Sequence, residues 1–172
     1  MAKYKPTRVV ADLEWWGPFS IQQVIDNDFP DDVRDVAGGI YAWYSRKSVF
    51  LGLMPKYKPM YVGQSKAGIT NRQKQHAKSK LIDDLLDFQE DAGTDILLWI
   101  SEISFTDANA EHAVEILDTV ERFFIVELDP KFNSQNRVRA KLPFAIDIRS
   151  KGQLPPMVKA KISRKSGEYV SV

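Results

Sequence analysis

The spacing of apolar side chains predicts three strands. After two glycines, residues 40–44 form a β-branched and aromatic run that is typical of a strand. Residues 60–63 form a second short strand behind a loop at 51–59, which holds two prolines and a glycine. These two strands are expected to pair antiparallel. The apolar run at 96–105 predicts a third strand, which is buried.

Two longer segments are predicted to be helical. A capping-box pattern, Thr70-x-x-Gln73, starts a helix or a pair of helices that covers about residues 71–88. Residues 109–128 show the clearest helical pattern in the chain, and an aspartate-proline pair ends it.

The order of these elements predicts a small α/β (α+β) domain, in which an antiparallel or mixed three-stranded sheet is flanked by helices. Its core is expected to span residues 38–136. Residues 1–37, with a short helix at 20–25, would pack on the core as an N-terminal extension, and residues 137–172 would form a basic C-terminal extension. A chain of 172 residues is long enough for one domain with a hydrophobic core and too short for two ordinary ones.

Composition restricts the chemistry. The chain has no cysteine, which excludes disulfides, thiolate zinc sites and cysteine nucleophiles, and its two histidines are too few for a histidine-rich metal site. A catalytic metal would therefore be a hard cation such as Mg²⁺ or Mn²⁺, held by carboxylate oxygen. The first residues contain no apolar run suited to a signal peptide or a membrane span, so a cytoplasmic protein without a membrane partner is expected.

The net charge of +1 conceals an uneven distribution of charge. Residues 36–82 carry nine lysines and arginines and no acid, and residues 131–172 carry ten against two acids. The acids are concentrated at 12–35 and 83–129. This separation predicts a bipolar surface with one face suited to a polyanion such as nucleic acid. The alternative is a basic stretch that neighbouring acids neutralise in the fold.

A single acidic position conflicts with its apolar surroundings. At about 100° per residue, Glu121 falls inside the broad apolar arc of the predicted helix 109–128, between Leu128 and Val114. A carboxylate on an apolar face costs free energy unless something pairs with it. Two interpretations follow: Glu121 forms a buried ion pair with an arginine or lysine, or it binds a metal ion.

Arg72 and His76 lie four residues apart on a predicted helix and therefore point the same way. Arginine is a permanent cation that can bind a phosphate through two parallel hydrogen bonds, and histidine can give or take a proton near neutral pH. Alone, such a pair on an exposed basic helix needs no role. Tyr41 and Tyr61 by themselves fit ordinary strand aromatics.

Taken in chain order, these residues resemble the GIY-YIG nuclease family. The match consists of Gly39-Ile40-Tyr41, Tyr61-Val62-Gly63, Arg72, His76, Glu121 and Asn133. The family tolerates these spacings: the arginine lies nine residues past the second triad, the histidine four past the arginine, and the asparagine twelve past the glutamate. The resemblance covers residues 38–136. It implies a metal-dependent endonuclease that hydrolyses DNA phosphodiester bonds by a one-metal mechanism.

The resemblance implies that Tyr41 is the general base that takes a proton from the attacking water, and that His76 assists Tyr41 or relays a proton. Tyr61 would hydrogen-bond near the scissile phosphate. A tyrosine with an ordinary pKa near ~10 is a poor base at neutral pH. The cations around Tyr41 are therefore expected to depress its pKa.

The resemblance also implies roles for three further residues. Arg72 would stabilise the charge that develops on phosphorus in the transition state. Glu121 would hold the single Mg²⁺, or Mn²⁺ in its place, on the leaving-group side. Asn133 would brace the site.

Two features depart from the family pattern. The segment between the two triads is longer than the minimal family hairpin and is suited to wrapping DNA. Gln64 stands where some relatives carry a lysine, and Lys66 would then supply the second cationic contact. The basic side chains expected to contact nucleic acid are Lys56, Lys58, Lys66, Lys74, Arg137 and Arg139.

Two classes of function follow from these motifs. The sequence shows no zinc-finger spacing and no clear helix-turn-helix, which favours a stand-alone nuclease that is restriction-like or processes DNA. Such an enzyme could act as a homodimer, because cutting two strands needs two sites or two events. The alternative is a nucleic-acid-binding module that keeps the fold without cleavage. RNA in place of DNA stays open.

Overall fold

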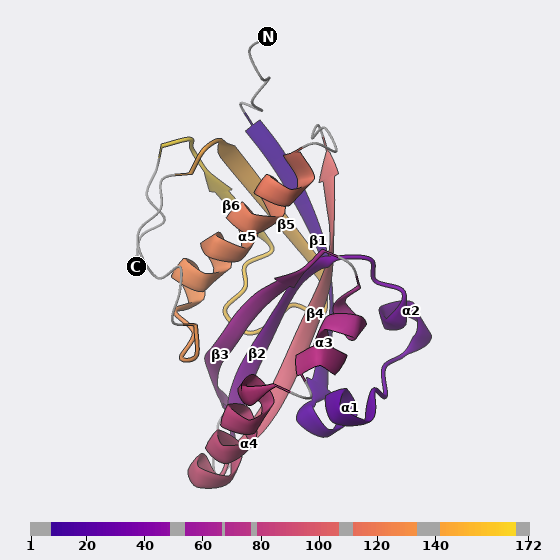
Figure 1. The fold of residues 1–172 in the computed structure, drawn as a ribbon. Coiled ribbons are helices and arrows are strands. Elements are labelled where there is room, and N and C mark those ends of the chain that lie inside the picture. The colour runs from indigo at the N-terminus through magenta and orange to yellow at the C-terminus, as the bar shows by residue number, and fades with distance from the viewer. Residues whose placement is uncertain are drawn as a thin grey trace.

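The chain folds around a curled six-stranded sheet. The computed structural model describes residues 8–48, 54–66, 68–76, 79–106, 112–133 and 142–167. The strands are β1 (Arg8–Ser20), β2 (Gly39–Lys47), β3 (Lys56–Ser65), β4 (Asp95–Thr106), β5 (Ala145–Gly152) and β6 (Lys161–Arg164). The helices are α1 (Ile21–Asp26), α2 (Asp31–Arg34), α3 (Ile69–His76), α4 (Lys80–Ala92) and α5 (Ala113–Leu128). In this part of the chain, the strand order is β3-β2-β4-β1-β5-β6 (Figure 1).

The predicted antiparallel pairing of the first two strands is confirmed, but the predicted three-stranded sheet is wrong. β2 pairs antiparallel with β3 on one side and with β4 on the other. The sheet continues past β4, because β1 pairs antiparallel with β4 and parallel with β5. The α+β class holds. The segments predicted as terminal extensions supply β1, β5 and β6 of this sheet.

β1 occupies the middle of the sheet because its side chains alternate between two environments. Val9, Ala11, Leu13 and Trp15 are all buried in a core that also contains residues of α5. A period of two places the intervening side chains on the opposite face. Each large apolar side chain buried in this way stabilises the fold by about 1.5–3 kcal/mol.

Hydrophobic cores cover both faces of the sheet. Ala42 and Tyr44 of β2 join a core with α5, whereas Tyr41 and Trp43 join a second core with α1 and α4, because neighbouring strand residues point to opposite faces. Helix α5 packs against β3 and β2, and in Figure 1 the helices α1–α4 gather in the lower half of the view. Among the described residues, no helix is long and apolar enough to cross a membrane.

Helices occur in the segments where they were predicted, but their first and last residues differ from the prediction. The segment at 71–88 is a pair, α3 and α4, and α4 continues to Ala92, where Gly93 with a φ of 56° ends it. α1 begins after Ser20, whose hydroxyl oxygen accepts a hydrogen bond of 3.2 Å from the backbone N–H of Gln23. α5 ends at Leu128, directly before the aspartate-proline pair.

The structure confirms one predicted strand and turns part of one predicted loop into strand. The strand predicted at 96–105 is confirmed as β4, but it is buried only over residues 96–101. Residues 56–59, predicted as loop, belong to β3 instead. Pro59 is tolerated there because β3 is an edge strand and its register against β2 shifts beside this residue.

Candidate functional site

Tyr41 of β2 and Tyr61 of β3 lie against the same hydrophobic core. Tyr41 is 1% exposed, and its ring lies directly against Gly63: a Cβ atom added to Gly63 would lie 2.4 Å from the Tyr41 hydroxyl oxygen. The two tyrosine rings are stacked, with centroids 6.1 Å apart and planes 28° apart. The glycine of the second triad therefore makes room for the tyrosine of the first.

Arg72 of α3 brings a cation to this pair of tyrosines. Its side chain is exposed, and it hydrogen-bonds to the side chain of Tyr41. Its Nη1 also donates to Oε1 of Gln75 over 3.2 Å. The first turn of α3 is held by Gly68, whose backbone N–H donates to the carbonyl of Ala37 over 2.5 Å. An exposed guanidinium fixed in this way is suited to bind a phosphate.

Glu121 approaches the same place from α5. It is half-buried, and its carboxylate lies close enough to Tyr41 and Tyr61 to raise the pKa of both hydroxyls. Gln64 of the edge strand β3 donates from Nε2 to Oε2 of Glu121 over 3.0 Å. Burial raises the pKa of the Glu121 carboxyl, and the hydrogen bond from Gln64 acts in the opposite direction. Among the described residues, the side chain that hydrogen-bonds to Glu121 is therefore the amide of Gln64 and not an arginine or lysine.

The expected depression of the Tyr41 pKa is not observed. Burial raises the pKa of the Tyr41 hydroxyl well above its ordinary value of 10.0, and neighbouring Tyr61 raises it further. The hydrogen bond from Arg72 lowers the pKa, but by less than burial raises it. Burial also raises the pKa of Tyr61. Both hydroxyls therefore carry their protons at neutral pH.

Asn133 braces the edge strand through two hydrogen bonds to one residue. Its Oδ1 accepts from the backbone N–H of Val62 over 2.8 Å, and its Nδ2 donates to the Val62 carbonyl, also over 2.8 Å. Asn133 is buried, so water cannot readily take the place of its side chain in these two hydrogen bonds. The bonds connect the segment after α5 to the middle residue of the second triad.

Asn133→Ala is expected to lower the free energy of unfolding by about 2–3 kcal/mol, because both Val62 backbone groups lose their partner. Urea unfolding followed by circular dichroism measures this change. Asn71→Ala, at an exposed position of α3, serves as the control and should change stability by less than about 0.5 kcal/mol. Equal stability of Asn133→Ala and the wild type would contradict the bracing role.

The oxygen donors beside Glu121 fit a hard divalent cation. Asp118, one turn earlier on α5, accepts from the same Gln64 Nε2 at Oδ1 over 2.5 Å. Gln64 Oε1 is buried and has no hydrogen-bond partner. The two carboxylates are ligands that Mg²⁺ and Mn²⁺ accept, together with water, and the Gln64 amide presents its nitrogen to them. Across the described residues, no group of three or more His, Cys, Asp or Glu side chains gathers for a metal.

The predicted nucleic-acid contacts are only partly brought to this site. Lys66 lies here, because its Nζ is 3.4 Å from Asp118 Oδ1. Lys56 and Lys58 lie at the other end of β3, eight and six residues before Gln64, or roughly 26 and 20 Å from it at about 3.3 Å per residue. Lys74 and His76 belong to α3, but their side chains lie outside the described part, as do Arg137 and Arg139 entirely.

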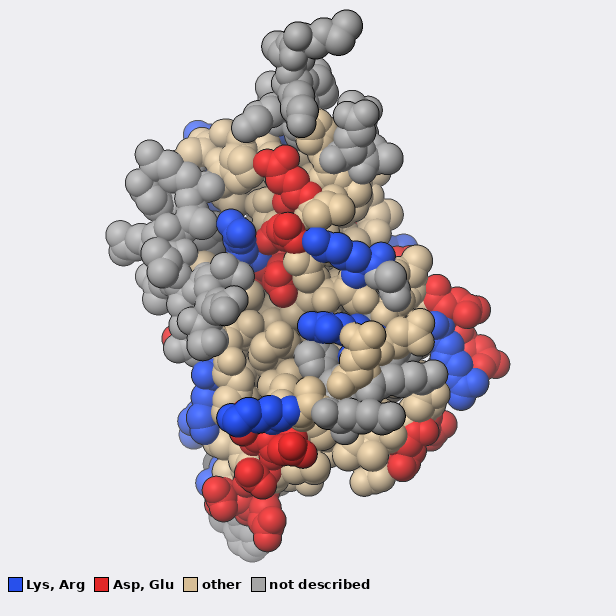
Figure 2. All heavy atoms as spheres, in the orientation of Figure 1, with Lys and Arg blue, Asp and Glu red and all other residues tan. Residues whose placement is uncertain are grey.

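Charges of both signs mix on the face that carries α5. Figure 2 shows a short column of acidic side chains near α5, with basic side chains on both sides of it. The ion pair between Lys66 and Asp118 is one such contact. On this face, the charge segregation along the sequence therefore gives neighbouring acids and bases rather than a uniformly basic surface.

Sequence reasoning missed Asp118 and the contact made by Gln64. Asp118 precedes Glu121 by three residues, so both carboxylates lie on one face of α5, and this spacing was the available signal. The contact with Gln64 depends on how α5 packs against β3, across 54 positions of the chain, and no local pattern indicates it.

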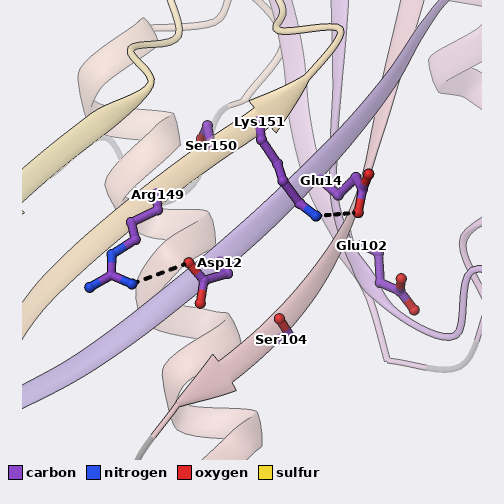
Figure 3. Close-up of a pocket in the computed structure, with 7 residues that line it drawn as sticks. All are labelled: Asp12, Glu14, Glu102, Ser104, Arg149, Ser150 and Lys151. Carbon is purple, nitrogen blue, oxygen red and sulfur yellow. Dashed lines mark ion pairs between the residues drawn. The ribbon is translucent and has the colours of Figure 1, made fainter.

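A separate cavity of about 500 Å³ lies over β1, β4 and β5 (Figure 3). Its charged side chains point toward one another: Lys151 Nζ is 2.8 Å from Glu14 Oε2, and Arg149 Nη1 is 3.9 Å from Asp12 Oδ1. Each ion pair joins neighbouring strands and neutralises one acid, Asp12 or Glu14, and Glu102 also lines the cavity. The cavity is a solvated part of the sheet, distinct from the site of Tyr41 and Glu121.

Comparison with known proteins identifies no relative: no family model matches the chain, and no curated protein or solved structure is significantly similar to it.

Proposed function

We propose that this protein is a metal-dependent endonuclease of the GIY-YIG type, which hydrolyses phosphodiester bonds of DNA. The observation that carries the proposal is the convergence of four side chains from four elements. Tyr41 of β2, Tyr61 of β3 and Arg72 of α3 meet at the edge strand β3, where Glu121 of α5 interacts electrostatically with both tyrosines. These four residues, which lie far apart along the sequence, are thus neighbours in space.

Hydrolysis of a phosphodiester needs an activated water, stabilisation of the extra charge on phosphorus, and help for the leaving oxygen. Arg72 supplies the charge stabilisation, because its exposed guanidinium is fixed on Tyr41 before substrate arrives. Glu121 and Asp118 present carboxylate oxygen for Mg²⁺ or Mn²⁺. The bound cation would supply Lewis-acid assistance to the leaving oxygen.

The raised pKa of Tyr41 changes the role that the resemblance implies for it. A phenol that keeps its proton at neutral pH is a poor general base. We propose instead that the Tyr41 hydroxyl is a neutral positioning group, which holds Arg72 toward the substrate. His76 lies four residues after Arg72 in α3, and a histidine can accept a proton near neutral pH. His76 is therefore our candidate for the proton acceptor.

Nicking of supercoiled plasmid tests the proposal against the non-catalytic alternative. Wild-type protein should convert the plasmid to open-circular and linear forms in Mg²⁺ or Mn²⁺ and should not do so in EDTA. A gel-shift assay in EDTA measures binding separately. Binding in EDTA without cleavage in either metal would favour a nucleic-acid-binding module. Cleavage of RNA but not of plasmid would show that the substrate is RNA, with the proposed phosphodiester hydrolysis unchanged.

A further inference from the structure

Gln64 occupies an unusual position between two carboxylates. Its single amide nitrogen donates to Asp118 Oδ1 over 2.5 Å and to Glu121 Oε2 over 3.0 Å. These two acceptors lie one turn apart on α5, and nearby like charges repel. The amide nitrogen therefore stands where a small cation would bind most favourably.

The other end of the same amide gives a second, independent observation. Gln64 Oε1 is sealed from solvent and accepts no hydrogen bond. A buried carbonyl oxygen without a donor costs about 1–3 kcal/mol. The two ends of a glutamine amide have nearly the same shape, so a half-turn about the last side-chain bond exchanges them. That half-turn would direct the oxygen toward the two carboxylates, where a cation could bind all three groups, and it would move the amide nitrogen into the sealed position.

We propose that Gln64 and Asp118 are ligands, together with Glu121, of the divalent cation that the proposed function requires. The inference rests on the proposed function for the choice of cation, Mg²⁺ or Mn²⁺, and extends the ligand set from the single glutamate that the resemblance implies to three residues. Lys66 neutralises Asp118 when no metal is bound, and its side chain is half-exposed and free to swing away. A lysine at position 64 would place a permanent ammonium in the cation position, whereas the glutamine of this chain leaves the position open to a metal ion.

Binding of Mn²⁺ without nucleic acid tests this inference. Electron paramagnetic resonance counts free Mn²⁺ in titrations of wild type, Gln64→Lys, Gln64→Glu and Asp118→Asn. We expect Asp118→Asn to weaken binding about tenfold and Gln64→Lys about a hundredfold, whereas Gln64→Glu should tighten it. Glu115→Gln, which removes an exposed carboxylate from the same helix outside the site, is the matched control and should stay within about twofold of wild type.

Thermal unfolding of each variant without metal shows that it is folded before its Mn²⁺ affinity is compared. Affinities of Gln64→Lys and Asp118→Asn within about twofold of wild type would overturn the inference, as would a wild type that binds no Mn²⁺. Plasmid cleavage is scored separately. A protein that binds Mn²⁺ through these three residues and cuts no nucleic acid would keep this inference and lose the proposed function.

Discussion

Glu121→Gln is expected to abolish cleavage while making the metal-free protein more stable at neutral pH. Cleavage should fall by about a thousandfold or more, because the amide is a weaker cation ligand than the carboxylate it replaces. Stability should rise, because burial raises the pKa of Glu121, so the folded protein holds an unfavourable charge at pH 7. An increase of roughly 2 °C in melting temperature is expected at pH 7.

The sign of this pH dependence follows from linkage. The raised pKa means that the wild type has its full stability below the unfolded value, near 4.5, and loses stability as the pH rises through the folded pKa. The advantage of Glu121→Gln should therefore disappear below about pH 4. Differential scanning fluorimetry from about pH 3 to 8, with Glu115→Gln as the control, measures it. A variant less stable than wild type at pH 7, or one that cuts normally, would contradict the assignment.

Arg72→Ala is expected to lower the turnover number by about 100- to 1,000-fold with little change in stability. Arg72 is exposed, so few packing contacts are lost, but the transition state loses its positioned cation. Arg72→Lys should recover only part of the activity, because an ammonium cannot form two parallel hydrogen bonds to a phosphate. Initial rates on a saturating oligonucleotide, with melting temperatures alongside, measure the effect.

Arg34→Ala is a suitable control for Arg72→Ala. Arg34 is likewise exposed on a helix and pairs with a carboxylate of its own helix, with Nη1 3.2 Å from Asp31 Oδ1. Its removal should leave the turnover number within about twofold of wild type. Equal losses in the two variants would show that total positive charge, rather than the placement of Arg72 on Tyr41, determines the rate.

The central part of the fold could be predicted from local patterns. β2, β4 and α5 are long and strongly patterned, and the glycines and prolines around them mark their ends. β1 was missed although apolar and acidic residues alternate from Ala11 to Trp15, because the run is short and is followed directly by a further tryptophan and a Gly-Pro break. β5 pairs in parallel with β1, and Val9 and Ile146 are register partners from opposite ends of the chain. Such pairing leaves no local signal.

The candidate site was predictable as a set of residues but not as an environment. The order of Tyr41, Tyr61, Arg72 and Glu121 along the chain is visible in the sequence. The burial that raises the pKa of Tyr41 arises in the core that packs this side chain against residues of β1, α1 and α4, and no local pattern indicates that packing. The partner of Glu121 likewise depended on tertiary packing, and a glutamine was not among the expected partners.

Incubation of wild type with mixed DNA and RNA substrates in Mg²⁺ or Mn²⁺, followed by end-sequencing of the products, tests the central claim most directly. Glu121→Gln and Arg72→Ala, purified in the same way, exclude a contaminating nuclease. The account predicts metal-dependent cleavage of DNA by the wild type and a loss of at least about a hundredfold in both variants. Intact substrates in every metal, or products formed equally by the variants, would contradict it.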